Sequence, residues 1–237
     1  VKTANLSTED IVLEVGPGKG ALTEKLLETG AEVISVEKDD RAIPFLSEKF
    51  SKEIKSGQLK IIHQDILQFD LSPHNPLYGL FSRKYSIIAN IPYYISGEFI
   101  RKFLESDIQP SQMIVMLQKE LAKRIVDKKG SILSISVKAY GNPKYITPVP
   151  RKFFRPMPNV DSAILLIENI SKKFFGKDQN GNNKEKINEE GIKEREKRGE
   201  ISEKETKISE KRNVIDEKRF FELLKAGFAH KRKVLIR

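Results

Sequence analysis

Four short apolar segments in the first half of the chain each end at a glycine or a polar residue, and this repeated pattern constrains the fold more than any other feature. The segments are Ile11–Val15, Glu32–Glu37, Leu59–Ile62 and Tyr85–Ala89. Apolar runs of this length predict buried strands, and the stretches 21–29 and 41–50 between them predict helices. Strands that alternate with helices indicate parallel strand–helix–strand units, so we expect an α/β protein with helices on both faces of one sheet.

The polar signals at the strand ends are expected to lie together. Glu14 and Gly16 come at the end of the first segment, Glu37 ends the second, Asp65 follows the third and Asn90 follows the fourth. In open parallel sheets, ligands bind just outside the carboxyl ends of the strands. The sequence therefore predicts one ligand site on this rim of the sheet.

The rest of the chain predicts further elements and a change of character after residue 175. We expect strands at 113–117, 144–149 and 162–168 and a helix at 119–126, whereas the apolar stretch 132–139 fits either class. Lys177–Arg212 has no aromatic residue and is dominated by Lys, Glu, Asn and Gly, which predicts a disordered insertion or, in part, a solvated charged helix. Amphipathic spacing returns at Phe220–Ile236.

These patterns predict three regions. Residues 1–175 form the main domain, 176–213 a charged low-complexity insertion, and 214–237 the start of a small helical C-terminal domain. Because the chain opens at Val1 and stops inside a basic amphipathic stretch, we expect a fragment of a longer protein, truncated at both ends.

Composition narrows the class of partner. The chain carries 43 Lys+Arg against 33 Asp+Glu, a net charge of +10 that favours a polyanionic partner. The absence of cysteine excludes disulfides, thiolate chemistry and Cys-based zinc sites, and the three histidines show no ligand spacing, so we expect no metal. No apolar run reaches the ~18 residues of a membrane span. We expect a cytoplasmic monomer that does not bind membranes.

The glycine-rich segment Gly16-Pro17-Gly18-Lys19-Gly20 predicts half of the site. A glycine turn after a strand lets bare backbone approach a ligand closely. Glu37, at the end of the next strand, can accept hydrogen bonds from ribose hydroxyls and would repel a ribose phosphate. Asp65 can accept from an adenine amino group. Each signal alone fits a plain turn or an exposed acid, but together they predict a nucleoside-bearing cofactor.

Asn90-Ile91-Pro92-Tyr93 predicts the other half. An adenine N6 amine is a poor nucleophile because its lone pair is delocalised into the ring. Two acceptors, the Asn90 side-chain oxygen and the Pro92 carbonyl, can hold its hydrogens and direct the lone pair, while Tyr93 stacks on the base. The alternative is a turn with a packed tyrosine.

Val12-Leu13-Glu14-Val15-Gly16-Pro17-Gly18-Lys19-Gly20 with Leu22-Thr23 resembles the first motif of Rossmann-like S-adenosylmethionine methyltransferases. Together with Asn90–Tyr93 and the segment Phe153–Ser162, the chain is similar to the rRNA adenine dimethyltransferases of the KsgA type, from about Asn5 to Ile170 and again from Phe220. The resemblance implies S-adenosylmethionine as cofactor and places Phe154 on the opposite face of a flipped base.

The candidate site then has two sets of residues. The catalytic set is Asn90, Pro92, Tyr93 and Phe154. The cofactor-binding set is Glu14, Gly16, Gly18, Glu37, Lys38, Asp65, Ile66 and Asn90.

The resemblance implies dimethylation of two adjacent adenosines near the 3′ end of small-subunit (16S) rRNA, with the small subunit or its precursor as partner. Ile91 is more usual in the related large-subunit enzymes that confer antibiotic resistance, and Tyr94 also departs from the small-subunit pattern. Gln118-Lys119-Glu120 and the segment around Phe228 favour the small-subunit enzymes. A non-catalytic rRNA-binding assembly factor is the remaining alternative.

Overall fold

The computed structural model describes residues 1–176 and 215–229 of the 237-residue chain. The chain divides into two compact units, Val1–Ile170 and Ser171–Arg237. The predicted insertion lies, except for Gly176, outside the described residues, and so do residues 230–237 of the predicted C-terminal region. The expected domain boundaries therefore stay predictions.

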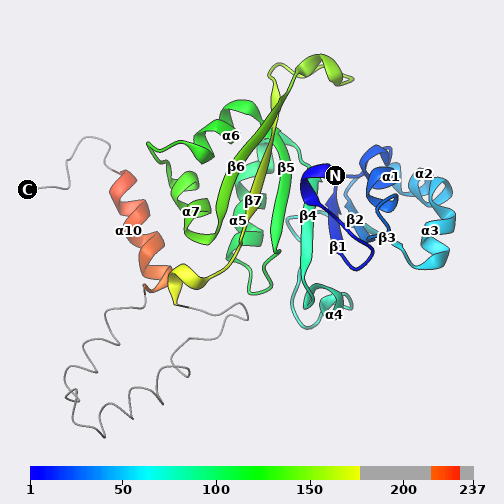
Figure 1. Cartoon of the computed structure of the whole chain (residues 1–237), viewed down its shortest axis with the longest axis horizontal. Helices are drawn as coiled ribbons and strands as arrows, with labels where there is room; N and C mark the ends of the chain where they lie inside the picture. Colours follow the sequence, from blue (N-terminus) through cyan, green and yellow to red (C-terminus); the bar gives the residue numbers. More distant parts are fainter. Residues whose placement is uncertain (177–214, 230–237) are drawn as a thin grey trace, which may run out of the picture. The chain divides into compact units, whose positions relative to one another are not determined.

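The first unit contains one seven-stranded sheet in the order β3-β2-β1-β4-β5-β7-β6 (Figure 1). The strands are β1 Ile11–Val15, β2 Glu32–Glu37, β3 Leu59–His63, β4 Tyr85–Asn90, β5 Gln112–Gln118, β6 Asn142–Val149 and β7 Ser162–Glu168. Strands β1 to β5 run parallel to one another, whereas β7 runs antiparallel to both β5 and β6. The predicted α/β class and all seven predicted strands are confirmed.

Helices cover both faces of the central strands. All five residues of β1 are buried, and because successive side chains point to opposite faces, both faces must be covered there. One core cluster joins Val12 of β1 and Val33 of β2 to Leu26 of α1, Leu46 of α2 and Phe50, which lies between α2 and α3. This double burial explains why the central strands are continuous apolar runs in the sequence.

The helices of the first unit are α1 Ala21–Leu27, α2 Ala42–Lys49, α3 Ser51–Ser56, α4 Tyr78–Phe81, α5 Ser96–Glu105, α6 Lys119–Val126 and α7 Ile132–Tyr140. The ambiguous stretch 132–139 is a helix, begun by Ser131, whose hydroxyl accepts the Ser134 N–H. Pro44 lies in the first turn of α2, where a missing N–H breaks no helical hydrogen bond. Helices α3, α4 and α5 were not predicted, although α5 buries Phe99, Ile100, Phe103 and Leu104 at helical spacing.

The second unit is described by a short 3-10 helix, η4 Lys173–Phe175, and by α10 Glu217–Ala229. Phe175 lies edge-on to Phe220 at 5.5 Å between ring centroids, and Phe220 lies edge-on to Phe221 at 5.1 Å. Lys172 pairs with Glu217 at 3.8 Å. The predicted C-terminal helix therefore begins at 217 and is described to 229. Within the described residues, every helix is too short or too polar to cross a bilayer.

Gly20 is a position where glycine is required for two separable reasons. Its φ is +74°, and an added Cβ would lie 2.4 Å from a ring carbon of the buried Phe50. We predict that Gly20→Ala lowers the free energy of unfolding by about 2–3 kcal/mol, from backbone strain plus overpacking.

Gly57→Ala is the matched control for Gly20→Ala. Gly57 has φ +83°, but no described atom lies within 4 Å of the place that an added Cβ would take. The free energy of unfolding of this variant, measured by chemical denaturation, should fall by only about 1 kcal/mol, from backbone strain alone. Equal losses for the two variants would contradict the proposed clash with Phe50.

Candidate active site

The glycine turn after β1 lies beside the carboxyl end of β4. Gly16, Gly18 and Gly20 all have positive φ, at 66°, 56° and 74°. A Cβ at Gly16 would lie 3.6 Å from the backbone oxygen of Asn90, and no described atom lies within 4 Å of a Cβ at Gly18. The predicted cofactor turn and the predicted amine-binding residue therefore meet, and bare backbone faces open space at Gly18.

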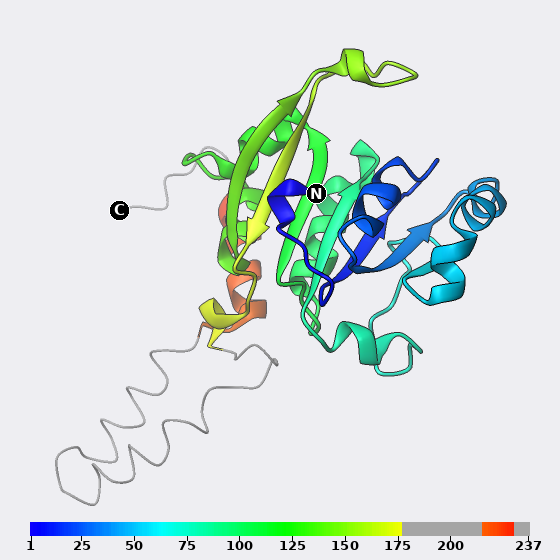
Figure 2. The same ribbon diagram turned by 45° about the vertical axis from the view of Figure 1, so that its right-hand side comes forward.

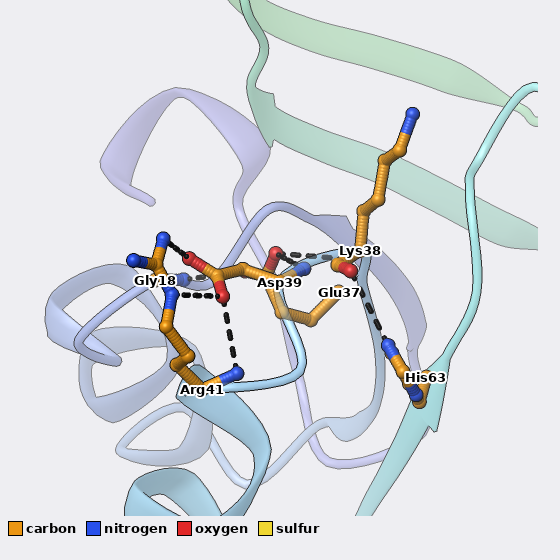
Figure 3. A network of polar contacts seen from close by, with 6 residues as sticks. All are labelled: Gly18, Glu37, Lys38, Asp39, Arg41 and His63. Atoms are coloured by element: carbon orange, nitrogen blue, oxygen red, sulfur yellow. Dashed lines mark hydrogen bonds and ion pairs between the residues drawn. The ribbon is translucent and has the colours of Figure 1, made fainter.

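The Glu37 carboxylate is held at the end of β2 by three backbone N–H groups (Figure 3). Its Oε2 accepts from Gly18 at 3.0 Å, and its Oε1 accepts from Lys38 and Asp39, each at 2.8 Å. A carboxylate has about four acceptor positions, so one position on Oε2 remains for a further donor. This fits a ribose hydroxyl of a nucleoside-bearing cofactor.

Asp65 and Lys38 form an ion pair at the end of β3. The Lys38 Nζ lies 2.7 Å from Asp65 Oδ2, and the Leu67 N–H donates to Asp65 Oδ1 at 2.9 Å. The Lys38 hydrogen bond lowers the pKa of Asp65, which keeps this group an acceptor. The Lys38 side chain is 71% exposed, so the pair can open to admit a ligand amine. Ile66, the next residue along the chain, is buried.

Glu14 lies in a different environment from the one expected. It comes one residue before the end of β1 and is fully buried rather than presented on the rim. Its Oε2 accepts from Thr23 at 2.8 Å and from Ser35 at 2.6 Å, while its Oε1 has no hydrogen-bond partner among the described residues. Burial raises the pKa of Glu14 from 4.5 to about 7. Glu14 therefore bonds to the helix that follows the glycine turn and to the neighbouring strand. Its direct contact with a cofactor stays a prediction.

The substrate motif begins where β4 becomes exposed. Tyr85–Ala89 is buried and Asn90 is exposed, so the amide side chain stands at the strand end. Pro92 precedes the 3-10 helix η2 Tyr93–Ile95, and its carbonyl accepts long hydrogen bonds from Ile95 at 3.3 Å and Ser96 at 3.4 Å. An incoming amine would share this oxygen or replace one of these weak donors.

Tyr93 connects the motif to β7, the antiparallel strand beside β5. Its hydroxyl lies 2.7 Å from the hydroxyl of Ser162, the buried first residue of β7. Ser162 pairs with Gln118 at the carboxyl end of β5, so the antiparallel β7 starts on the same rim as Asn90. The loop that carries the half-buried Phe154 is thereby brought to this rim, and its stacking role stays a prediction.

Three supporting residues were absent from the predicted site: Thr23, Ser35 and Ser162. Ser35 had a visible signal, because it is a polar residue in the middle of an apolar strand. Thr23 lies in the same motif segment as its partner Glu14, whereas Ser162 is 69 residues away from its partner Tyr93. Among the described residues, no group of three or more His, Cys, Asp or Glu could hold a metal.

The strand order and the glycine turn against an acid at the end of β2 define a Rossmann-like methyltransferase fold. The chain belongs to the ribosomal RNA adenine dimethylase family, whose model matches residues 1–197. This confirms the family resemblance found in the motifs.

Individual relatives agree with this family. Ribosomal RNA small subunit methyltransferase A of Dehalococcoides mccartyi is 46% identical over 166 residues, which cover 69% of this chain and 55% of that protein. A dimethyladenosine transferase structure from Plasmodium falciparum has a TM-score of 0.61 at 29% identity, covering 73% of this chain and 60% of that one. The 23S rRNA methyltransferase ErmE also has a TM-score of 0.61, at 28% identity, covering 71% and 64%. The chain thus spans about half the length of the curated relatives that it matches.

The buried Glu14 predicts an unusual pH dependence of stability. Between pH 4.5 and about 7 the folded state keeps a proton that the unfolded state has lost, so stability falls as the pH rises through this window. Glu14→Gln cannot titrate. The free energy of unfolding of Glu14→Gln, relative to that of the wild type, should therefore rise by about 3 kcal/mol between pH 4 and pH 8.

Urea denaturation at several pH values measures this difference, with the exposed Glu48→Gln as control. Parallel pH profiles for the wild type and Glu14→Gln would contradict the assignment.

The Tyr93–Ser162 hydrogen bond predicts coupling between two distant segments. Tyr93→Phe and Ser162→Ala should each cost about 1 kcal/mol of stability, because each leaves the other hydroxyl without its partner. The double variant should cost less than the sum of the two, and thermal unfolding of all four proteins measures the coupling. Strict additivity would show that the two hydroxyls act independently.

Proposed function

We propose that this protein transfers methyl groups from S-adenosylmethionine to the N6 amines of two adjacent adenosines near the 3′ end of small-subunit rRNA. The observation that carries this proposal is the contact between its two half-sites, where the position of a Gly16 Cβ lies 3.6 Å from the Asn90 backbone oxygen. A cofactor bound at the glycine turn and an amine held by Asn90 would then be close enough for direct transfer.

The residues of the chain divide the work. Glu37 accepts from ribose hydroxyls, Asp65 accepts from the cofactor's adenine amine, and Gly18 leaves room for the ligand. When bound, the cofactor supplies an electrophilic methyl group on a sulfonium.

Asn90 and the Pro92 carbonyl hold the two hydrogens of the target amine and turn its lone pair toward that methyl. Tyr93 and Phe154 hold the faces of the base. Because the amine nitrogen is weakly basic, the cation that it becomes on accepting the methyl group gives its proton to water without a strong general base.

The curated relatives, which are named as small-subunit methyltransferases, favour small-subunit rRNA over large-subunit rRNA. ErmE is as similar in fold as the dimethyladenosine transferase, so the fold alone does not separate the two substrates. The large-subunit alternative is favoured by Ile91, a residue that is more usual at this position in the related large-subunit enzymes. An assembly factor without activity would not need Glu37, Asp65 and Asn90, all of which are present. We further propose that the protein acts as a monomer in the cytoplasm, a reducing compartment that the lack of cysteine suits.

Small subunits purified from cells that lack the modification provide the test. The full-length protein is incubated with them and labelled S-adenosylmethionine, and the digested rRNA is analysed by mass spectrometry. We expect N6,N6-dimethyladenosine at two neighbouring positions. Incorporation into large-subunit rRNA would favour the alternative substrate, and no incorporation into either RNA would reject an enzymatic role.

Asn90→Ala separates chemistry from cofactor binding. Loss of the amide oxygen removes an acceptor that acts on the target amine, so methyl transfer should fall by about 100-fold or more. Affinity for S-adenosylhomocysteine in calorimetry should stay within about threefold, because the glycine turn contacts the Asn90 backbone rather than its side chain. Asn142→Ala, at an exposed asparagine that begins β6, is the control. An active Asn90→Ala would remove the amide from the mechanism.

A further inference from the structure

The loop of residues 150–161, which joins β6 to β7, exposes large apolar side chains that the fold does not use. Phe153 is 70% exposed, Met157 56% and Val160 42%. In both views this segment extends beyond the end of the sheet (Figures 1 and 2). Three large apolar side chains exposed in one short loop indicate a contact surface rather than a packing element.

The base of the loop is braced, so these side chains are presented by a fixed backbone. The Arg151 N–H donates to Asp161 Oδ1 at 3.0 Å, and the Arg151 guanidinium donates to the Asn159 carbonyl at 3.2 Å. The Lys119 N–H donates to the Asp161 carbonyl at 3.0 Å, which ties the loop to the start of α6. A loop that is already ordered loses little entropy when it binds.

The charges of the loop indicate a polyanion as its partner. Arg151, Lys152 and Arg155 are exposed, and Asp161 is the loop's one acid. The Lys152 Nζ lies 5.5 Å from the centroid of the Phe153 ring, so a cation stands directly beside the most exposed aromatic of the loop. Apolar side chains flanked by cations are the combination that inserts between bases while neutralising phosphates.

The position of the loop connects it with the target base. Asp161 is followed by Ser162, whose hydroxyl bonds to Tyr93 of the amine-binding motif. The loop therefore leaves the sheet directly beside the place where a base would be held. An adenine can enter that place only after it leaves its stack, and the gap it leaves needs filling.

We propose that residues 153 and 157 form a wedge that inserts between the bases flanking the target adenine and holds the gap that the flipped base leaves. The inference rests on the proposed function and extends it to a second set of RNA contacts. Phe153 and Met157 are positioning residues, because they touch the neighbouring bases and not the reacting amine. Phe154, by contrast, is predicted to stack on the target base itself.

Kinetics on unmodified small subunits test the wedge. Phe153→Ala should lower kcat/KM for the subunits by about 10-fold, the effect of losing one base-stacking aromatic. Its affinity for S-adenosylhomocysteine should not change. Phe153→Leu, which keeps apolar bulk, should recover most of the activity.

Phe45→Ala is the matched control, because Phe45 is a 49% exposed phenylalanine on α2, outside the site. If the wild type methylates and Phe153→Ala matches it, the wedge is overturned while the proposed function stands. If the wild type does not methylate, both are overturned.

A direct readout keeps the inference testable if Phe153→Ala folds poorly. A photo-crosslinking phenylalanine analogue placed at position 153 should crosslink to rRNA within about two nucleotides of the methylated adenines, the range of one inserted side chain. The same analogue at position 45 should not do so. Crosslinks from position 153 to ribosomal protein, or to distant rRNA, would overturn the wedge.

Discussion

The hydrogen bond from the Gly18 N–H to the Glu37 carboxylate is the interaction on which the site depends. It joins the turn after β1 to the end of β2, and it can form because the two strands are parallel with Val15 opposite Val36. The Gly16 N–H donates to the Val36 carbonyl at 3.0 Å, which continues the ladder into the turn. One carboxylate therefore fixes the glycine backbone, which itself has no side chain to anchor it.

Glu14 is a second acid, after Glu37, that lies close to the glycine turn, and its burial lowers the stability of the fold. A fully buried carboxyl with one oxygen unpartnered within the described residues is expensive to ionise, and its raised pKa is the sign of that cost. The two hydroxyls that bond to it come from α1, which follows the turn, and from β2, the strand that pairs with β1. The buried acid thus links β1 to the helix after the turn and to the neighbouring strand.

The sequence predicted where these residues lie in the sheet. The glycine turn, Glu37, Asp65 and Asn90 each lie at the end of a recognisable strand or just after it, and the topology of a parallel sheet brings such positions together. The inward placement of Glu14 was missed, because strand alternation, not residue type, decides which face a side chain takes. The Tyr93–Ser162 bond could not be predicted from spacing, because its partners are 69 residues apart and meet only through the antiparallel β7.

The antiparallel strand β7 explains how one sheet can hold both halves of the candidate site. The parallel strands β1 to β4 bring the predicted cofactor residues and Asn90 to one rim. Because β7 runs against β5, its first residue lies at the end of β5 and the loop before it arrives at the same rim. The loop that carries Phe154 and the exposed Phe153 therefore begins its return to the sheet at the rim that holds Asn90.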